Sequence, residues 1–189
     1  GTTALIGNDP GLGTPATGDI AFIVDNISLS GGNIETQGEI SIAPQTADRT
    51  IGIGNGSTGD LFLSDAELGK LVVGTKLTIG DSAAGTGDLD LDTMDLSGTS
   101  YDVEIYGGDI DIAHMTMGEG SFFAYARDGA DAADLTVSTA IARTADGDAT
   151  LELRADQNII IADTITANDA NSDADGDPTT SPDRLKVIL

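Results

Sequence analysis

Cysteine and tryptophan are missing from this chain of 189 residues, and histidine occurs once. The absence of cysteine excludes a disulfide framework, a thiolate metal site and a cysteine nucleophile, and it leaves the redox compartment open. A single histidine excludes a metal site that needs several imidazoles. The G-x-S-x-G elbow of many hydrolases is also missing from the sequence. We therefore expect a protein that is not an enzyme.

Positive charge and long apolar runs are scarce as well. Eight Lys and Arg residues oppose 32 Asp and Glu residues, which gives a net charge of −24. Such a chain has no basic surface for nucleic acid or anionic lipid, so we expect neither as a partner. No run of 18 apolar residues is present, which argues against direct membrane insertion. The first ten residues also lack the basic start and apolar stretch of a signal peptide. Any export signal is expected to have been removed or to lie outside this segment.

The acidic residues are mainly of one type, since 26 are Asp and six are Glu. Aspartate favours turns and caps, whereas glutamate favours helices. The 25 glycines agree with this, because glycine supplies the tight corners of a chain that reverses often. A hydrophobic content of 39% is close to that of ordinary globular proteins. The composition predicts a folded, β-dominated protein with little helix.

Apolar residues recur in pairs one position apart, as expected of short strands whose alternate side chains face one interior. Turn-forming residues separate most of these pairs. Strands this short gain stability when they stack as the coils of a solenoid, because each coil covers the apolar edge of the next. We predict an all-β parallel β-helix (β-solenoid) with coils of about 20 residues. The predicted strands contain Ile27/Leu29, Ile40/Ile42, Ile51/Ile53, Leu61/Leu63, Leu77/Ile79, Leu89/Leu91, Val103/Ile105, Ile110/Ile112, Leu135/Val137, Leu151/Leu153, Ile159/Ile161 and Leu185/Val187.

Three segments depart from this rhythm. Residues 65–73 (DAELGKLVV) have near-helical spacing, which predicts a single helical turn or a wider corner. Residues 168–183 (NDANSDADGDPTTSPD) contain almost no apolar side chain, which predicts an acidic loop that leaves the column. Residues 1–19 are rich in Gly, Thr and Pro and are expected to form an irregular N-terminal linker. The predicted organisation is this linker followed by one β-helix domain over residues 20–189, with the acidic loop inserted at 168–183.

Two stretches resemble a known family. Residues 50–81 (TIGIGNGSTGDLFLSDAELGKLVVGTKLTIGD) resemble the repeat of filamentous-haemagglutinin-like exoproteins, which are bacterial surface adhesins often secreted by a two-partner route. Residues 149–167 (ATLELRADQNIIIADTITA), with residues 184–189 (RLKVIL), are similar to that family's coil pattern. The acidic loop at 168–183 is a departure, since the family usually has a tight turn there. The resemblance covers about two thirds of the chain, from about Ile20 onward.

This resemblance implies a right-handed parallel β-helix in a secreted, non-enzymatic protein of the bacterial cell surface. It also implies that the 189 residues are a slice of a longer chain. The expected role is that of a rigid stalk or filament subunit for surface attachment or cell–cell contact. The expected partners are further copies, joined end to end or laterally, and a glycan or protein on a host or neighbouring cell.

The acidic loop contains the sharpest local pattern. Asn171, Asp173, Asp175 and Gly176 match the first half of an EF-hand calcium loop, in which alternating oxygen ligands surround the ion. The final position, which should be a bidentate glutamate, is Pro182, so a complete EF-hand is not expected. A Ca²⁺ site is predicted from some subset of five residues, with a solvated loop as the alternative. These residues are Asp169, Asn171, Asp173, Asp175 and Asp177.

Other acidic residues alternate with apolar ones. Asp88, Asp90 and Asp92 are separated by leucines, and Asp109 and Asp111 flank an isoleucine. On a strand, these carboxylates project to one face. They would form a solvated outer surface or, if neighbouring coils align, a ladder that holds cations.

Two further motifs have a structural interpretation. Gly54, Gly56 and Gly59 form a G-x-G-x-x-G pattern, but the residues that follow read as a strand. Dinucleotide binding needs a helix there to receive the pyrophosphate, so we interpret the glycines as a corner. His114 lies in an apolar stretch and is expected to be structural rather than catalytic.

The few aromatic residues leave two other functions open. Most of them are expected in the core, with an exposed contact patch as the alternative for a subset. One alternative function is a calcium-dependent carbohydrate-active β-helix enzyme, in which aspartates act as acid and base. The other is a glycan-binding module that also needs calcium. The aromatic residues concerned are Tyr101, Tyr106, Phe122, Phe123 and Tyr125.

Overall fold

The computed structural model describes residues 17–83, 87–128, 133–145, 148–167 and 185–189. Within these ranges the protein is all-β, with parallel sheets and one short helix, α1 (Asp65–Leu68). The prediction of a β-dominated chain is confirmed. The predicted linker over residues 1–19 lies mostly outside the described ranges, and the first strand begins at Ile20. The predicted loop at 168–183 lies outside them entirely.

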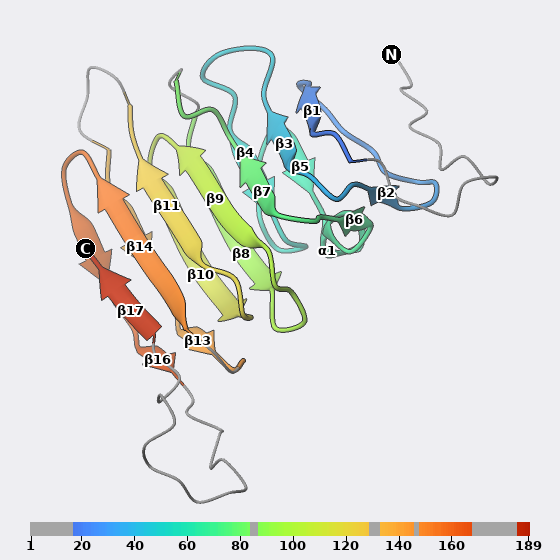
Figure 1. Ribbon diagram of the computed structural model, residues 1–189. Helices are drawn as coiled ribbons and strands as arrows, with labels where there is room; N and C mark the ends of the chain where they lie inside the picture. The colour runs from blue at the N-terminus through green and yellow to red at the C-terminus, as the bar shows by residue number, and fades with distance from the viewer. Residues whose placement is uncertain (1–16, 84–86, 129–132, 146–147, 168–184) are drawn as a thin grey trace, which may run out of the picture.

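The first sheet has seven strands, and their order in the sheet is their order in the chain (Figure 1). Every neighbouring pair is parallel. Between two consecutive strands the chain always leaves this sheet and passes through strands of another. The strands are β1 (Ile20–Ile23), β3 (Ile40–Ala43), β7 (Lys76–Ile79), β9 (Asp102–Gly107), β11 (Phe122–Ala126), β14 (Ala149–Ala155) and β17 (Leu185–Ile188).

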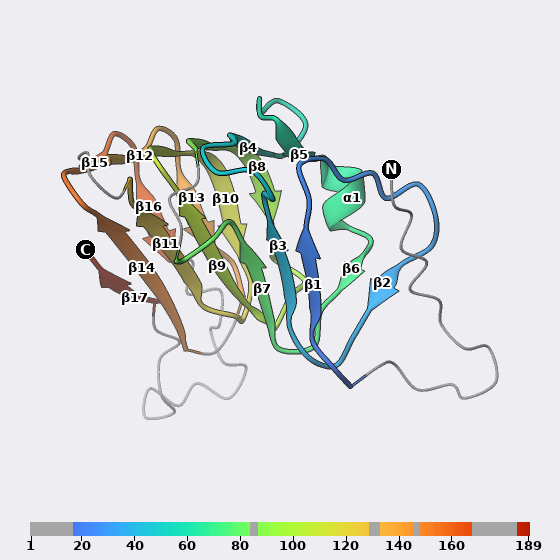
Figure 2. The same ribbon diagram turned by 90° about the horizontal axis from the view of Figure 1, so that it is seen from above.

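The second sheet lies behind the first and is also parallel (Figure 2). Its main path is β5 (Leu61–Leu63), β4 (Ile51–Ile53), β8 (Leu89–Asp95), β10 (Ile110–Met117), β12 (Leu135–Val137) and β15 (Ile159–Ile161). Two more strands extend this sheet beside the second half of β10. The strand β13 (Ile141–Arg143) pairs with β10, and β16 (Ile165–Ala167) pairs with β13. A small third sheet pairs β2 (Ile34–Glu35) with β6 (Leu71–Val72).

The core is made of apolar columns that run across the strands. Leu77, Val103, Phe122 and Leu151 occupy one register position in successive strands of the first sheet, and each is at most 1% exposed. Full burial of a side chain of this size contributes about 1.5–3 kcal/mol. Because the columns come from alternate positions, the same period that predicted the strands also fills the space between the sheets.

The strands β8 and β10 bend at the same register position. In β10, Ile112 and Met115 are both buried although two residues separate them, so the alternation shifts by one place. In β8, Leu91 and Met94 show the same shift. This bend explains why β12 pairs with the first half of β10 and β13 with the second half.

Eleven of the twelve predicted apolar pairs lie in strands, and the exception has a physical cause. Ile27 and Leu29 lie in an irregular segment. The Leu29 N–H donates to Glu67 Oε1 at 3.1 Å, and the Leu29 carbonyl accepts from Lys70 Nζ. Because side chains from α1 and the residue before β6 satisfy this backbone, it does not pair as a strand.

The predicted spacing of about 20 residues holds at only some steps. Ile20 pairs with Ile40, twenty residues later, and Val103 pairs with Phe122, nineteen residues later. Ile40 instead pairs with Leu77, 37 residues later. The long step contains β4, β5, α1 and β6, so an insertion at a corner lengthens the connection while the register is kept.

The helix α1 confirms the helical turn predicted within residues 65–73. Ser64 Oγ accepts the Glu67 N–H, and the Glu67 carboxylate accepts the Ser64 N–H, which forms a capping box. Partial burial acts to raise the pKa of Glu67, but the N–H groups of Ser64 and Leu29 outweigh it and lower that pKa. The glutamate therefore both caps α1 and fastens it to the irregular segment at Leu29.

The loop from Gly54 to Asp60 lies flat on the outer face of β4 and β8. Gly54 has a φ of +92°, which favours glycine. A Cβ on Gly59 would lie 2.2 Å from the Gly52 nitrogen. The close approach explains these glycines without a bound phosphate.

We predict that Gly59→Ala lowers the free energy of unfolding by about 1–3 kcal/mol, because the added methyl has to push the loop away from β4. Urea denaturation measures this loss. Gly98→Ala is the matched control, since no atom lies within 4 Å of the methyl that it adds. Equal effects of the two substitutions would contradict the steric explanation.

Candidate functional site

The predicted calcium ligands Asp169, Asn171, Asp173, Asp175 and Asp177 all lie outside the described residues. The calcium site therefore stays a prediction. Within the part of the chain that the structure describes, no three His, Asp or Glu side chains are grouped so that they could hold a metal ion.

An aspartate ladder runs along one corner of the second sheet. Asp88, Asp109 and Asp134 each stand one residue before a strand, and Asn158 takes the fourth place. The Asp109 N–H donates to Asp88 Oδ1 at 3.1 Å, and the Asp134 N–H donates to Asp109 Oδ1 at 2.8 Å. Asn158 donates both its N–H and its Nδ2 to Asp134 Oδ1, at 3.0 and 2.9 Å. Each acidic side chain thus accepts a hydrogen bond from the backbone N–H of the residue that precedes the next strand.

Two of the three remaining predicted aspartates on this face fasten the glycine loop of residues 54–60. Thr58 donates its N–H to Asp90 Oδ2, and Gly56 donates its N–H to Asp92 Oδ2, both at 2.9 Å. Asp111 lies exposed on β10, in register with Asp90. The outward projection of these carboxylates is confirmed, and most of them also have a structural role as acceptors.

These aspartates line a shallow acidic hollow of about 660 Å³ on the outer face of the second sheet. Threonines at positions 50, 58 and 136 complete its walls. Because neighbouring strands are about 4.8 Å apart, the carboxylates repel one another at low ionic strength. The hollow can attract cations and repel anionic ligands. Its acidic residues are Asp60, Asp88, Asp90, Asp109, Asp111 and Asp134.

We predict that Asp109→Ala lowers the free energy of unfolding by about 0.5–1.5 kcal/mol, because the Asp134 N–H loses its acceptor. Asp109→Asn keeps an acceptor oxygen and removes one of the repelling charges, so its effect should be smaller or of opposite sign. Denaturation in low and high salt measures both variants. A loss for the asparagine variant as large as that for alanine would contradict the role of the ladder.

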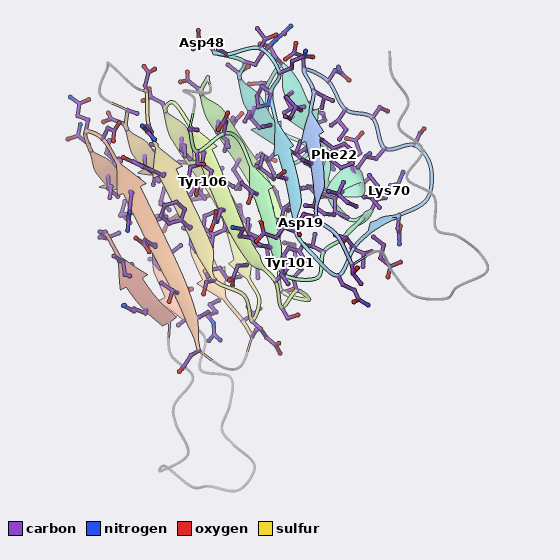
Figure 3. All side chains as sticks on the ribbon, turned by 45° about the horizontal axis from the view of Figure 1, so that its top comes forward. Asp19, Phe22, Asp48, Lys70, Tyr101 and Tyr106 are labelled. Atoms are coloured by element: carbon purple, nitrogen blue, oxygen red, sulfur yellow. The ribbon has the colours of Figure 1, made fainter. Side chains whose placement is uncertain are left out.

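A second candidate site lies on the outer face of the first sheet, where the rings of Tyr106, Phe123 and Tyr125 lie side by side. Tyr106 is labelled in Figure 3. The Tyr106 and Phe123 ring centroids are 5.7 Å apart, and those of Phe123 and Tyr125 are 6.4 Å apart. The Arg154 guanidinium lies over the Phe123 ring at 5.4 Å. We call these four residues the aromatic patch. Burial in the core is confirmed for Phe122 and wrong for the three rings of the patch, which point outward from the sheet.

Carboxylates accept hydrogen bonds from the hydroxyl groups of both tyrosines in the aromatic patch. Tyr106 Oη donates to Glu104 Oε2 at 3.0 Å, and Tyr125 Oη donates to Asp156 Oδ1 at 2.8 Å. Burial, and then the bond to Glu104, raise the pKa of Tyr106 to about 12. The bond to Asp156 raises the pKa of Tyr125. The fold thus favours the neutral phenols, and this stabilisation is lost as the pH rises above about 10.

We predict that Glu104→Gln lowers the pKa of Tyr106 from about 12 part of the way to its usual value near 10. The change should be partial, because burial is the larger cause and persists. Alkaline titration followed by NMR of the tyrosine rings measures it. Asp156→Asn is the matched control, which should move Tyr125 and leave Tyr106 in place. No change in Tyr106 on Glu104→Gln would contradict the assigned bond.

The glycine motif and the single histidine both lie on the second sheet or in the loop that covers it. The strand β5 follows Gly54, Gly56 and Gly59, as predicted, so no helix begins there to receive a pyrophosphate. His114 is exposed at the bend of β10, in register with Thr93. The shift of alternation at the bend turns the ring outward, and the expected structural rather than catalytic role of His114 stays a prediction.

Comparison with protein-family models, with curated proteins and with solved structures found no match to this chain. Among the described residues, no helix is long and apolar enough to cross a membrane.

Proposed function

We propose that this chain is a right-handed parallel β-helix that serves as a rigid, non-enzymatic stalk or filament segment on a bacterial cell surface. The alternation of the chain between parallel sheets supports the solenoid. The apolar columns also support the solenoid. The strand order in the first sheet supports it too, because the strands lie in the sheet in the same order as in the chain. We propose the right-handed sense of the β-helix because connections between parallel strands strongly prefer a right-handed path. A column of this kind is stiff, because every coil is hydrogen-bonded to the next.

The observation that carries the assembly role is the open C-terminal end of both sheets. Ile161 is in register with Val137, and Val187 is in register with Leu151. The two inner partners are 0% exposed, whereas Ile161 is 37% and Val187 is 41% exposed. Inward-facing side chains thus continue to the last strands without a cover among the described residues. A second molecule seated on this end would cover them and extend the rod.

The opposite end presents a matching surface. On β1, Phe22 is in register with the fully buried Ile42 but is itself only partly buried, and β1 pairs on only one side among the described strands. Unpaired strand edges at both ends are suited to end-to-end pairing. We therefore propose a second copy as the partner in a filament. A glycan or protein of a host or neighbouring cell is the proposed target of attachment.

Calcium is the proposed cofactor of this assembly. The segment with Asp169, Asn171, Asp173, Asp175 and Asp177 lies in the chain between β16 and β17. A divalent cation bound there would reduce the repulsion between two molecules that each carry a net charge of −24.

We predict that the purified chain forms elongated assemblies whose length increases with protein concentration, and that Val187→Asp reduces them. The reason is that the new carboxylate lies on the apolar surface that a second molecule would cover. Sedimentation velocity and electron microscopy, each with calcium and with chelator, measure the assemblies. Longer assemblies with calcium would support the calcium role.

Ser100→Asp is the matched control, because it adds the same charge at an exposed turn between β8 and β9, which lie in the middle of the two sheets. It should assemble like the unchanged chain. Separate rods under every condition, or equal assembly of Val187→Asp, would refute end-to-end association.

A glycan-binding module is the second candidate, and the aromatic patch is the observation that favours it. Aromatic rings flanked by carboxylates are suited to contact sugar rings and their hydroxyl groups. If the assembly experiment gives only separate rods, glycan binding becomes the activity to assay. The carbohydrate-active enzyme would additionally need the flanking carboxylates of Glu104 and Asp156 to act as acid and base, whereas both accept tyrosine hydroxyl groups.

A further inference from the structure

A slot opens beside the second half of β8. It has a volume of about 600 Å³ and is lined by residues of α1, β6, β7, β8 and the turn after β8. Its floor is apolar, since Leu71, Leu77, Met94 and Leu96 are only 1–6% exposed. Tyr101, which is labelled in Figure 3, also lines the slot and is half-buried. A mostly apolar pocket of this size is typical of sites that bind small molecules.

The slot exists because the chain leaves the second sheet early. The strand β4 pairs with β8 only from Leu89 to Leu91. After Gly54 the chain forms the glycine loop, β5 and α1, and it returns as β6, which pairs with β2. Among the described strands, the second half of β8 therefore pairs with β10 alone, and this half of β8 lines the slot.

Two carboxylates stand at the rim of the slot. Asp65 and Asp95 are both exposed, and among the described lining residues none carries a positive charge. The Ser97 N–H donates to Asp95 Oδ1 at 2.9 Å and lowers the pKa of Asp95, so this group is ionised at neutral pH. Lys70, the residue before β6, donates to the Leu29 carbonyl and does not line the slot. The rim is therefore negative.

The apolar floor and the negative rim together define the class of ligand. The floor favours a hydrocarbon or aromatic body, which is removed from water on binding. The carboxylates attract a positive group and repel an anionic one. Burial raises the pKa of Tyr101, so its hydroxyl stays neutral and adds no negative charge. An amphipathic organic cation suits both surfaces, whereas a fatty acid or another anionic amphiphile suits only the floor.

We propose that the slot binds a small amphipathic ammonium compound. Its apolar body lies on Leu71, Met94 and Leu96, and its ammonium group lies at the rim with Asp65 and Asp95. Because both carboxylates are exposed and screened by salt, apolar contact supplies most of the affinity and the charges supply the selectivity. This assignment does not rest on the proposed stalk or filament role.

Titration of the full chain with two probes that share one apolar body tests the proposal. The probes are 4-phenylbutylamine and 4-phenylbutanoate, which differ in the sign of their charge. The chain has only three methionines, so NMR of their labelled ε-methyl groups locates the bound ring. With the amine, the Met94 signal should shift saturably and more than those of Met115 and Met117, which lie one strand away on β10. At low salt the amine should bind about tenfold more tightly than the carboxylate, and high salt should reduce this ratio.

The double variant Asp65→Asn/Asp95→Asn separates the effect of the rim charges from that of the floor. It should weaken binding of the amine by about three- to tenfold and remove most of the preference for the amine, because the attraction at the rim is lost. Asp111→Asn/Asp163→Asn is the matched control, since it removes two exposed carboxylates that do not line the slot. It should bind both probes like the unchanged chain. A thermal melt of each variant shows whether the fold is intact.

No saturable shift of Met94 with the amine would overturn the proposal, as would equal binding of the two probes at low salt. Equal weakening by the two double variants would also overturn it, because the effect would then come from net charge alone. The comparison of the two probes uses the unchanged chain, so it tests the proposal even if the rim variant fails to fold.

Discussion

Parallel pairing in fixed register is the constraint on which the rest of this structure depends. Each strand of the first sheet must align with the preceding one so that residues such as Val103, Phe122 and Leu151 form one buried column. A slip of one residue would exchange buried and exposed faces, so register is strongly specified. The corners are free to vary in length, which is why 19 residues separate one aligned pair and 37 separate another.

The corners also explain the large number of aspartates. A parallel strand begins with an amide that its own sheet ladder does not always satisfy, and a short acidic side chain at the start of the neighbouring strand can accept it. Asp88, Asp109 and Asp134 do this in succession. Aspartate suits the position better than glutamate because its shorter side chain reaches the adjacent amide with less loss of rotamer entropy. The resulting charge is tolerated because the carboxylates lie on the outer surface.

Much of the strand pattern could be predicted because alternation is a local property. Leu89 with Leu91 and Ile110 with Ile112 are examples, and the helical turn at Asp65 carried its capping box in the sequence. Ile27 and Leu29 show the same alternation but are not a strand, because Glu67 and Lys70 bind the Leu29 backbone from about 40 residues away. From the sequence, the exposed aromatic patch could be predicted only as an alternative to burial of these rings in the core. Whether Phe122 or Phe123 faces inward depends on register, which the sequence does not state.

The sequence by itself determined that the chain is acidic, free of cysteine and built of short strands, because composition and alternation act within a few residues. Only the tertiary structure decided which strands are neighbours, where β8 and β10 bend, and which aspartates accept which amides. It also decided that β6 pairs with β2, so that among the described strands the second half of β8 pairs with β10 alone. These choices join residues 20 to 40 positions apart. They depend on how corner insertions are accommodated in space, which no local pattern encodes.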